Sequence, residues 1–425
     1  MVNPIRIEAD YLIETALDPM KAAATMAGEQ SSGTFLAVPG ETLELKERSA
    51  ARVEHLEIIG EVTEPSLPGA GVPKGGASVW RQALVTLSWP IENLGPSLPN
   101  LVATIAGNLF ELNAFSGLRL LDIRLPTAFS ERYTGPKFGI QGTRKLSGVE
   151  GRPLIGTIIK PSVGLSAAGT GELVSELAGA GIDFIKDDEL QADGPTCPFE
   201  KRVEAVMDAI HRAADKTGKK TMFAFNLTGE IDEMRRRHDF VLEQGGSCVM
   251  ASVNSVGFAG IVELARHTQL PVHGHRNGWG AMTREPSLGW SFPAWSKLWR
   301  LAGCDHMHVN GLANKFTESD DSVVLSARSL AEPMFEHSPM CAMPVFSSGQ
   351  TIWQAEGTWA ALQSPDLIMT AGGGVVAHPS GSAAGVEALC EAWDAAMSGQ
   401  TIQERAQENE ALAEAMNTYP NNIRA

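Results

Sequence analysis

The chain has 425 residues, of which 43% are hydrophobic and 20% charged, and its formal net charge is −16 at pH 7. Length and composition are typical of a globular protein with two or three domains. Nucleic acids and anionic membranes require a basic surface, so we expect neither as a partner. An anionic substrate must be held by a few local cations.

The sequence does not predict a disulfide framework, a zinc site or a targeting segment. The five cysteines are odd in number, widely spaced and without a CxxC pair, which is typical of free thiols in a reducing compartment. The first residues, MVNPIRIEADYLIETAL, are too acidic and polar for a signal peptide. No run of about 18 apolar residues could form a membrane span. We therefore expect a cytoplasmic protein.

Residues 1–140 predict an N-terminal α+β domain of the ferredoxin-like type. Partly alternating apolar residues at 53–62 and 79–89 indicate strands of an antiparallel sheet, and helical patterns at 19–28 and 97–108 flank them.

Residues 141–425 predict a (β/α)8 TIM barrel followed by C-terminal helices. Short apolar runs alternate with amphipathic helical segments, and eight such units fit a closed barrel better than an open doubly wound sheet. The tail 384–417 reads as helix with a break at Gly399. The eight expected strands are 155–159, 182–185, 221–226, 248–253, 271–274, 305–309, 343–346 and 367–370.

Polar and glycine clusters follow six of these strands, where a barrel places its functional residues. The second strand ends in Lys186, Asp187, Asp188 and Glu189. Asp188 and Glu189 suit a hard cation such as Mg²⁺. Lysine is not an oxygen ligand, but carbamylation by CO2 would turn Lys186 into one.

Other strand ends carry groups suited to an anionic substrate. Arg276 and His308 are donors for an anion, and the glycines after the eighth strand offer backbone N–H groups to a phosphate. Lys160 in the mouth is a candidate for moving protons. Lys315 follows Gly311 in a loop whose composition indicates a lid.

Each cluster has a plainer explanation when taken alone. An acidic run is usually a solvated loop, and a glycine triplet often only permits a tight turn. His306 and His308 are two residues apart, so both could line the mouth, or one could support the other. The coincidence of the clusters at successive strand ends favours a site.

The motifs together resemble the large subunit of RuBisCO over nearly the whole chain. The second-strand motif DFIKDDE is the most specific. The matching segments are GEQSSGTF (28–35), AGNLFEL (106–112), GTIIKPSVGLS (156–166), DFIKDDE (183–189), HGHR (273–276), HVNGLANK (308–315), PVFSSG (344–349) and GGGVVAHPSG (372–381).

The resemblance implies a homodimer in which the N-terminal domain of one subunit completes the site of the other. It implies Mg²⁺ as cofactor, held by Lys186 as its carbamate with Asp188 and Glu189. The other catalytic positions that it implies are Lys160, His275, Lys315, Asn108 and Glu29. The substrate- and phosphate-binding positions that it implies are Thr34, Arg276, His308, Ser347, Gly349, Gly372 and Gly373.

Departures from RuBisCO argue against CO2 fixation. Ser162 replaces a second lysine, Trp279 a histidine, Phe35 a tryptophan and Ser348 a glycine. The chain therefore resembles a RuBisCO-like protein (form IV) acting on a phosphorylated substrate through an enediolate. Trp279 and Phe35 could either shape the substrate pocket or fill space left by the missing polar side chains.

We expect decarboxylation of a 3-oxo sugar-acid phosphate, such as 3-oxo-isoapionate 4-phosphate. The alternatives are a transcarboxylase/hydrolase of the same substrate and an enolase or isomerase of a methylthio-sugar phosphate. Asn108 argues against the salvage enolase, which typically has a lysine there. A remote alternative is a non-catalytic protein that binds a sugar phosphate; a complete metal set beside a proton-transfer lysine argues against it.

Overall fold

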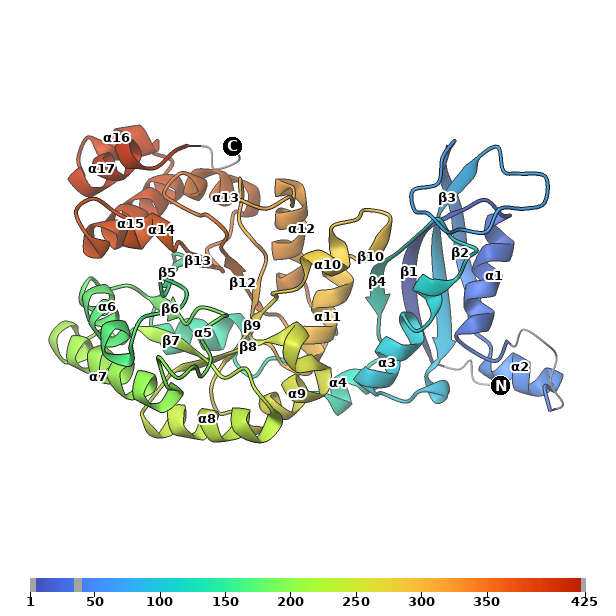
Figure 1. Ribbon diagram of the computed structural model, residues 1–425, viewed down its shortest axis with the longest axis horizontal. Coiled ribbons are helices and arrows are strands. Elements are labelled where there is room, and N and C mark those ends of the chain that lie inside the picture. The colour runs from blue at the N-terminus through green and yellow to red at the C-terminus, as the bar shows by residue number, and fades with distance from the viewer. Residues whose placement is uncertain (1–4, 34–39, 422–425) are drawn as a thin grey trace. The chain divides into compact units, whose positions relative to one another are not determined.

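The computed structural model describes residues 5–33 and 40–421. Two compact units make up the structure (Figure 1). The first comprises residues 1–134, 278–301 and 334–338, and the second comprises the rest. The expected domain boundary near residue 140 thus lies close to residue 134, where the chain first passes from the first unit to the second. Two later segments of the chain, 278–301 and 334–338, belong to the first unit again. Within the described ranges, no helix is long and apolar enough to cross a membrane.

The first unit is built on a five-stranded sheet in the order β10-β4-β1-β3-β2. β1 pairs antiparallel with β3 and β4, whereas β10 adds to β4 in parallel. Buried residues alternate along most of β1, as expected for a sheet with one covered face. The strands are β1 (Arg6–Thr15), β2 (Arg52–Val62), β3 (Trp80–Pro90), β4 (Gly117–Arg124) and β10 (Leu288–Trp290).

The first unit also contains several helices. The side chain of Asp18 accepts a hydrogen bond from the backbone N–H of Lys21, which caps α1, and α1 packs against β2 and β3. The helices are α1 (Pro19–Glu29), α2 (Leu43–Ser49), η1 (Ile91–Asn93), α3 (Leu98–Ile105), η2 (Leu109–Glu111), α4 (Ala128–Arg132), α10 (Gly280–Thr283) and α11 (Phe292–Ala302).

The second unit is a closed barrel of eight parallel strands, which confirms the predicted fold. Pairing of β11 with β9 closes it, and an apolar cluster that includes Phe184, Met250 and Val345 fills its centre. The strands are β5 (Leu154–Ile158), β6 (Phe184–Lys186), β7 (Met222–Asn226), β8 (Cys248–Ser252), β9 (Val272–His275), β11 (His306–His308), β12 (Met343–Phe346) and β13 (Ile368–Thr370).

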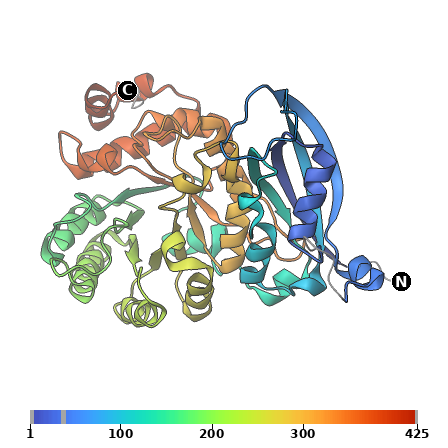
Figure 2. The ribbon, with the colours of Figure 1, turned by 45° about the vertical axis from the view of Figure 1, so that its right-hand side comes forward.

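Helices surround the barrel strands (Figure 2). The predicted break in the tail is confirmed, because α15 ends at Ser398 and Gly399 adopts φ 77°. The helices are α5 (Gly139–Ser147), α6 (Ala167–Gly179), α7 (Phe199–Thr217), α8 (Ile231–Glu243), α9 (Val253–His267), α12 (Asp320–Ala331), α13 (Gln354–Leu362), α14 (Gly373–Val376), α15 (Ser382–Ser398), α16 (Ile402–Ala406) and α17 (Glu410–Thr418).

Asp305, directly before β11, joins three backbone segments inside the barrel unit. One oxygen of its carboxylate accepts hydrogen bonds from the N–H groups of Phe138 (2.6 Å) and Gly139 (2.8 Å), and the other accepts one from Val272 (2.8 Å). The side chain is buried, and burial raises its pKa to about 6 although the three N–H groups lower it. The start of α5 is thereby fixed to two neighbouring strands.

We predict that Asp305→Asn lowers the free energy of unfolding by about 1–3 kcal/mol, because the amide leaves at least one buried N–H without an acceptor. Urea denaturation measures this, with the exposed Asp208→Asn as control. Equal stability of the two variants would contradict the role of Asp305.

Candidate active site

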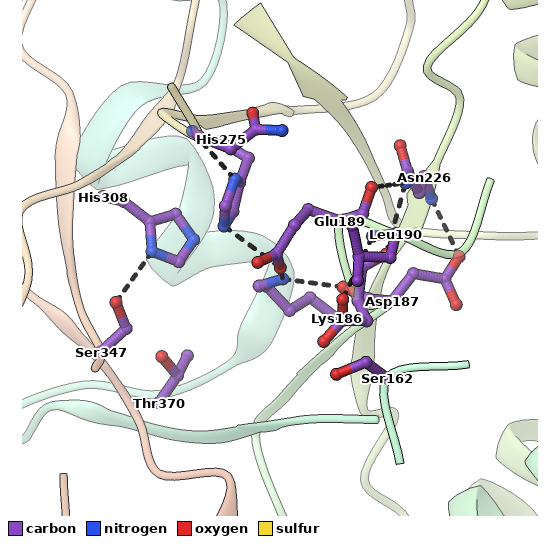
Figure 3. Close-up of polar contacts among 12 residues, drawn as sticks. Ser162, Lys186, Asp187, Glu189, Leu190, Asn226, His275, His308, Ser347 and Thr370 are labelled. Atoms are coloured by element: carbon purple, nitrogen blue, oxygen red, sulfur yellow. Dashed lines mark hydrogen bonds and ion pairs between the residues drawn. The ribbon is translucent and has the colours of Figure 1, made fainter. Parts of the chain in front are cut away.

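The mouth of the barrel, formed by the carboxyl ends of its strands and the loops that follow, gathers most of the predicted residues. Figure 3 shows the side chains of Lys186, Glu189, His275, His308 and Ser347 there. All of them belong to the barrel unit. The strand-end rule therefore places these side chains in one region.

Lys186 is the last residue of β6, and its side chain is only 1% exposed. Its Nζ donates to the backbone oxygen of Asp187 (2.8 Å) and lies 3.4 Å from Glu189 Oε2. Burial lowers the pKa of Lys186, while the neighbouring carboxylates raise it. The amine is thus held among oxygen atoms and away from water.

Asp187, the middle residue of the charged run, is a structural acid. Its fully buried carboxylate lies 3.2 Å from Arg202 Nε on α7 and accepts from the backbone N–H of Asn226 (2.9 Å). Burial raises the pKa of Asp187, and Arg202 opposes that shift. The pair turns Asp187 away from Lys186, whereas Glu189 faces it.

Asn226, at the end of β7, supports the same run and was not predicted as a site residue. Its Nδ2 lies 3.3 Å from the backbone oxygen of Asp188 and 3.2 Å from that of Glu189. Its Oδ1 accepts from Thr228. A polar residue ending an otherwise apolar strand was the available sequence signal.

Lys160 and Asp188 form an ion pair at the mouth. Lys160 Nζ lies 2.7 Å from Asp188 Oδ2 and donates to Ser162 Oγ at 2.9 Å. The Lys160 side chain is 40% exposed, whereas that of Asp188 is 2% exposed. Ser162, which replaces the second lysine of RuBisCO, thus acts as a hydrogen-bond acceptor for Lys160.

Glu189 and His275 face each other across the mouth. His275 Nε2 lies 3.4 Å from Glu189 Oε2, and His275 Nδ1 accepts from the N–H of Asn277 (3.2 Å). The proton of the neutral ring is therefore on Nε2. Burial and then Lys186 lower the pKa of His275 to about 4, so the ring is neutral at pH 7. Burial opposes ionisation of Glu189, but His275, which is protonated below its own pKa, and Lys186 lower the pKa of Glu189 to about 2.

This set of groups fits a magnesium ion. Asp188 and Glu189 offer carboxylate oxygens, which are the ligands that Mg²⁺ prefers. Both belong to one backbone run held by Asn226 and by the Asp187–Arg202 pair. Lys186 would fit only after conversion of its amine into an anionic oxygen ligand.

Arg276, the expected anion-binding residue after β9, already has an anionic neighbour. Its Nη2 lies 2.7 Å from Glu318 Oε2, and both side chains are largely buried. Burial lowers the pKa of Arg276, and Glu318 raises it. Glu318 was not predicted, and no sequence pattern marked it.

His308 and His306 lie at different depths. His308 Nδ1 lies 3.0 Å from Ser347 Oγ, and its Nε2 lies 2.8 Å from His273 Nε2. His306 instead contacts Thr143 Oγ1 at 2.7 Å in the barrel interior. Only His308 thus reaches the groups of the mouth. Burial lowers the pKa of His308 well below its usual value, so the ring is neutral.

The predicted glycine positions line the loops after β12 and β13. Gly349 adopts φ 86°, a conformation that side chains rarely tolerate. Gly372 lies beside the Lys160 side chain, and a Cβ there would stand 3.6 Å from its Cε. Gly373 is exposed, with nothing within 4 Å of a Cβ. A side chain at Gly372 would therefore contact Lys160, whereas one at Gly373 would extend into open space.

Lys315 lies in the loop that follows β11. Its backbone N–H donates to the oxygen of Ser348 (3.2 Å), and its Nζ lies 5.3 Å from the centre of the Phe316 ring. The role of Lys315 as a lid residue stays a prediction.

The remaining predicted residues belong to the first unit. Glu29 is the last residue of α1 and Asn108 directly precedes η2, while Thr34 and Phe35 lie outside the described residues. Trp279 is 5% exposed and packs against Phe292 and Trp295. This packing favours the space-filling explanation for Trp279.

A separate group of possible metal ligands lies on α8 and α9. His238 Nδ1 and His267 Nε2 lie 2.9 Å and 2.6 Å from Asp239 Oδ1. The N–H of Gln269 donates to His238 Nε2, so Nδ1 carries the proton directed at Asp239. Hydrogen bonding accounts for this cluster without an ion.

Comparisons with known proteins agree with the geometry. Residues 139–419 match the family model "Ribulose bisphosphate carboxylase large chain, catalytic domain", and residues 9–129 match the corresponding N-terminal domain.

Two relatives and one solved structure resemble nearly the whole chain. The chain is 58% identical to a 3-oxo-isoapionate-4-phosphate transcarboxylase/hydrolase from Xanthobacter autotrophicus, covering 97% of this chain and 98% of the relative. It is 41% identical to a 3-oxo-isoapionate-4-phosphate decarboxylase from Rhizobium rhizogenes, covering 96% and 97%. A crystal structure of a rubisco-like protein from Burkholderia fungorum superposes with a TM-score of 0.91 at 46% identity, covering 97% and 100%.

We predict that Arg202→Met lowers the free energy of unfolding by about 3–5 kcal/mol, because it leaves the buried Asp187 without its cation. The double variant Asp187→Asn/Arg202→Met should recover part of this loss. Chemical denaturation measures both, with the exposed Arg212→Met on the same helix as control. A single variant as stable as that control would show that the pair does not support the acidic run.

Proposed function

Because this chain belongs to the ribulose bisphosphate carboxylase (RuBisCO) large-chain family, as one of its RuBisCO-like proteins, we propose that it is a transcarboxylase/hydrolase of 3-oxo-isoapionate 4-phosphate. The supporting observation is the 58% identity to an enzyme of that name, against 41% to the decarboxylases of the same compound. The comparisons thus favour the alternative in our sequence analysis over the decarboxylation that we expected. Decarboxylation remains the second candidate.

The proposal assigns Lys186, Asp188 and Glu189 to a Mg²⁺ site. Only a neutral amine can attack CO2, and burial favours the neutral amine by lowering the pKa of Lys186. The nitrogen would form a bond to carbon and lose a proton, which leaves an anionic carbamate. A bound Mg²⁺ would supply Lewis-acid stabilisation of negative charge on substrate oxygens.

The chemistry of a 3-oxo acid fits these groups. When its carboxyl group leaves as CO2, both electrons of the broken C–C bond stay on the substrate as an enediolate. Transcarboxylation requires the same CO2 to form a new bond at the other enediolate carbon. Water then adds to the ketone of the new 3-oxo acid, a C–C bond breaks, and the carbon that leaves takes up a proton.

Lys160 is the proposed proton carrier for these steps. It is anchored by Asp188 at 2.7 Å, yet its side chain is 40% exposed, so its Nζ can reach a substrate in the mouth. His275 carries a neutral Nε2–H beside Glu189 and can donate to a substrate oxygen. These roles would be lost in a protein that only binds a sugar phosphate.

The proposal also assigns the substrate phosphate and the second subunit. The phosphate would be held by Thr34, Gly349, Gly372 and Gly373, with Ser347 beside it, and Lys315 would close over the substrate.

Members of the family form dimers or octamers. We propose a homodimer in which Glu29 and Asn108 of one subunit complete the site of the other. Analytical ultracentrifugation tests this, and an active monomer would contradict it.

Substrate labelled with ¹³C at its carboxyl group tests the reaction. We predict that the enzyme, with Mg²⁺ and unlabelled bicarbonate, retains the label in a carboxylate product, because the same CO2 returns to the enediolate. ¹³C NMR follows the label. Lys186→Met should lower turnover by at least about a thousandfold, whereas Lys201→Ala, on the exposed face of α7, should not.

The alternatives give different spectra. Label released as bicarbonate, with solvent deuterium incorporated into the product, would assign the decarboxylase. No turnover of this substrate by a folded, Mg²⁺-loaded enzyme would contradict the proposal.

A further inference from the structure

The anion-binding end of the mouth around Arg276 and His308 contains a carboxylate of the protein itself. Glu318 Oε2 lies 2.7 Å from Arg276 Nη2. The Arg276 side chain is 7% exposed and that of Glu318 is 14% exposed, so solvent screens the pair only weakly. Glu318 therefore occupies a donor that a substrate phosphate would use.

Glu318 is held in this position by further contacts. Asn310 Nδ2 donates to Oε2 at 2.6 Å, and Ser322 Oγ donates to Oε1 at 2.9 Å. Asn310 is itself fixed, because Ser348 Oγ donates to its Oδ1 at 2.7 Å. An incoming anion would have to break this set of hydrogen bonds to displace the carboxylate.

Ser348 stands where RuBisCO has a glycine, and its backbone adopts φ 72°. Asn310 is likewise a non-glycine residue with positive φ, at 66°. Their side chains bond to each other across the loops after β11 and β12. Positive φ is unfavourable for Ser348, whereas asparagine tolerates it, and the contact fixes the two loops to each other.

The positive charge of Arg276 is therefore offset within this end of the mouth. Burial lowers the pKa of His308 well below its usual value, and both ring nitrogens already contact Ser347 and His273. Arg276 supplies one positive charge, and Glu318 offsets it. A phosphate dianion placed here would lie near a fixed carboxylate.

We propose that Glu318 makes this end of the mouth receive an uncharged, hydroxyl-bearing end of the substrate, so that the enzyme selects sugar-acid monophosphates over sugar bisphosphates. The inference rests on the proposed function, because it takes the barrel mouth as the substrate site. Specificity here comes from repulsion of the wrong ligand as well as attraction of the right one. A single phosphate then has one place to bind, the glycine loops after β12 and β13.

Glu318→Gln is the test, because the amide keeps the shape of the side chain and removes only its charge. Its oxygen can still accept from Arg276 and Asn310, and its NH2 can donate to Ser322. The probe is ribulose 1,5-bisphosphate, with binding to the Mg²⁺-loaded enzyme measured by calorimetry. We predict that the variant binds it at least about tenfold more tightly than the wild type. Asp321→Asn removes an equal charge from the exposed start of α12 and should change this affinity less than about twofold.

Two results would overturn the inference. One is bisphosphate affinity in Glu318→Gln within twofold of the wild type; Glu318→Ala serves if the first variant does not fold. The other needs no variant, namely wild-type enzyme that binds ribulose 1,5-bisphosphate tenfold more tightly than ribulose 5-phosphate. The third outcome is that Glu318→Gln binds the bisphosphate more tightly, as predicted, but the enzyme does not turn over 3-oxo-isoapionate 4-phosphate. This outcome would overturn the proposed reaction and support the role of the Glu318 charge.

Discussion

Burial of Lys186 at the end of β6 is the constraint on which the site depends. The amine of Lys186 is 1% exposed and lies among oxygen atoms, which the chain supplies from the backbone of Asp187 and the side chain of Glu189. A run of three acids would repel itself if all three faced one point. The carboxylate of Asp187 pairs with Arg202 instead, so the carboxylates of Asp188 and Glu189 remain for the mouth. A structural ion pair thus gives Asp187 a different role from the two acids that follow it.

The two ends of the mouth differ because the cation at one end is partly exposed and the cation at the other end is buried against a carboxylate. At the Lys186 end, Lys160 pairs with Asp188 and its side chain remains 40% exposed, so solvent and substrate can reach it. At the opposite end, Arg276 is buried against Glu318, which is held by Asn310. His275 and His308 of the mouth are neutral, because burial lowers their pKa values. We propose that an acidic chain can in this way hold one phosphate without attracting anions along the whole mouth.

Sequence patterns predicted the barrel well, because each strand is a local apolar run and most of the predicted site residues lie at the end of one or in the loop that follows it. All eight expected runs overlap the observed strands. The patterns could not show that β10 joins the N-terminal sheet, since that pairing depends on residues far apart in the chain.

The sequence did not predict Asn226 and Glu318 for the same reason. Asn226 acts on the backbone of another loop, and Glu318 acts on a guanidinium 42 positions away. The sequence also could not show that His306 lies deeper than His308, because that depth is seen only from its contact with Thr143 in α5.

The most direct measurement of the central claim is ¹³C NMR of the enzyme equilibrated with ¹³C-bicarbonate and Mg²⁺. If the buried amine of Lys186 becomes the third metal ligand, the wild type shows a carbamate resonance that disappears in Lys186→Met and persists in Lys201→Ala. A carbamate resonance that survives in Lys186→Met, or none in the wild type, would contradict the account.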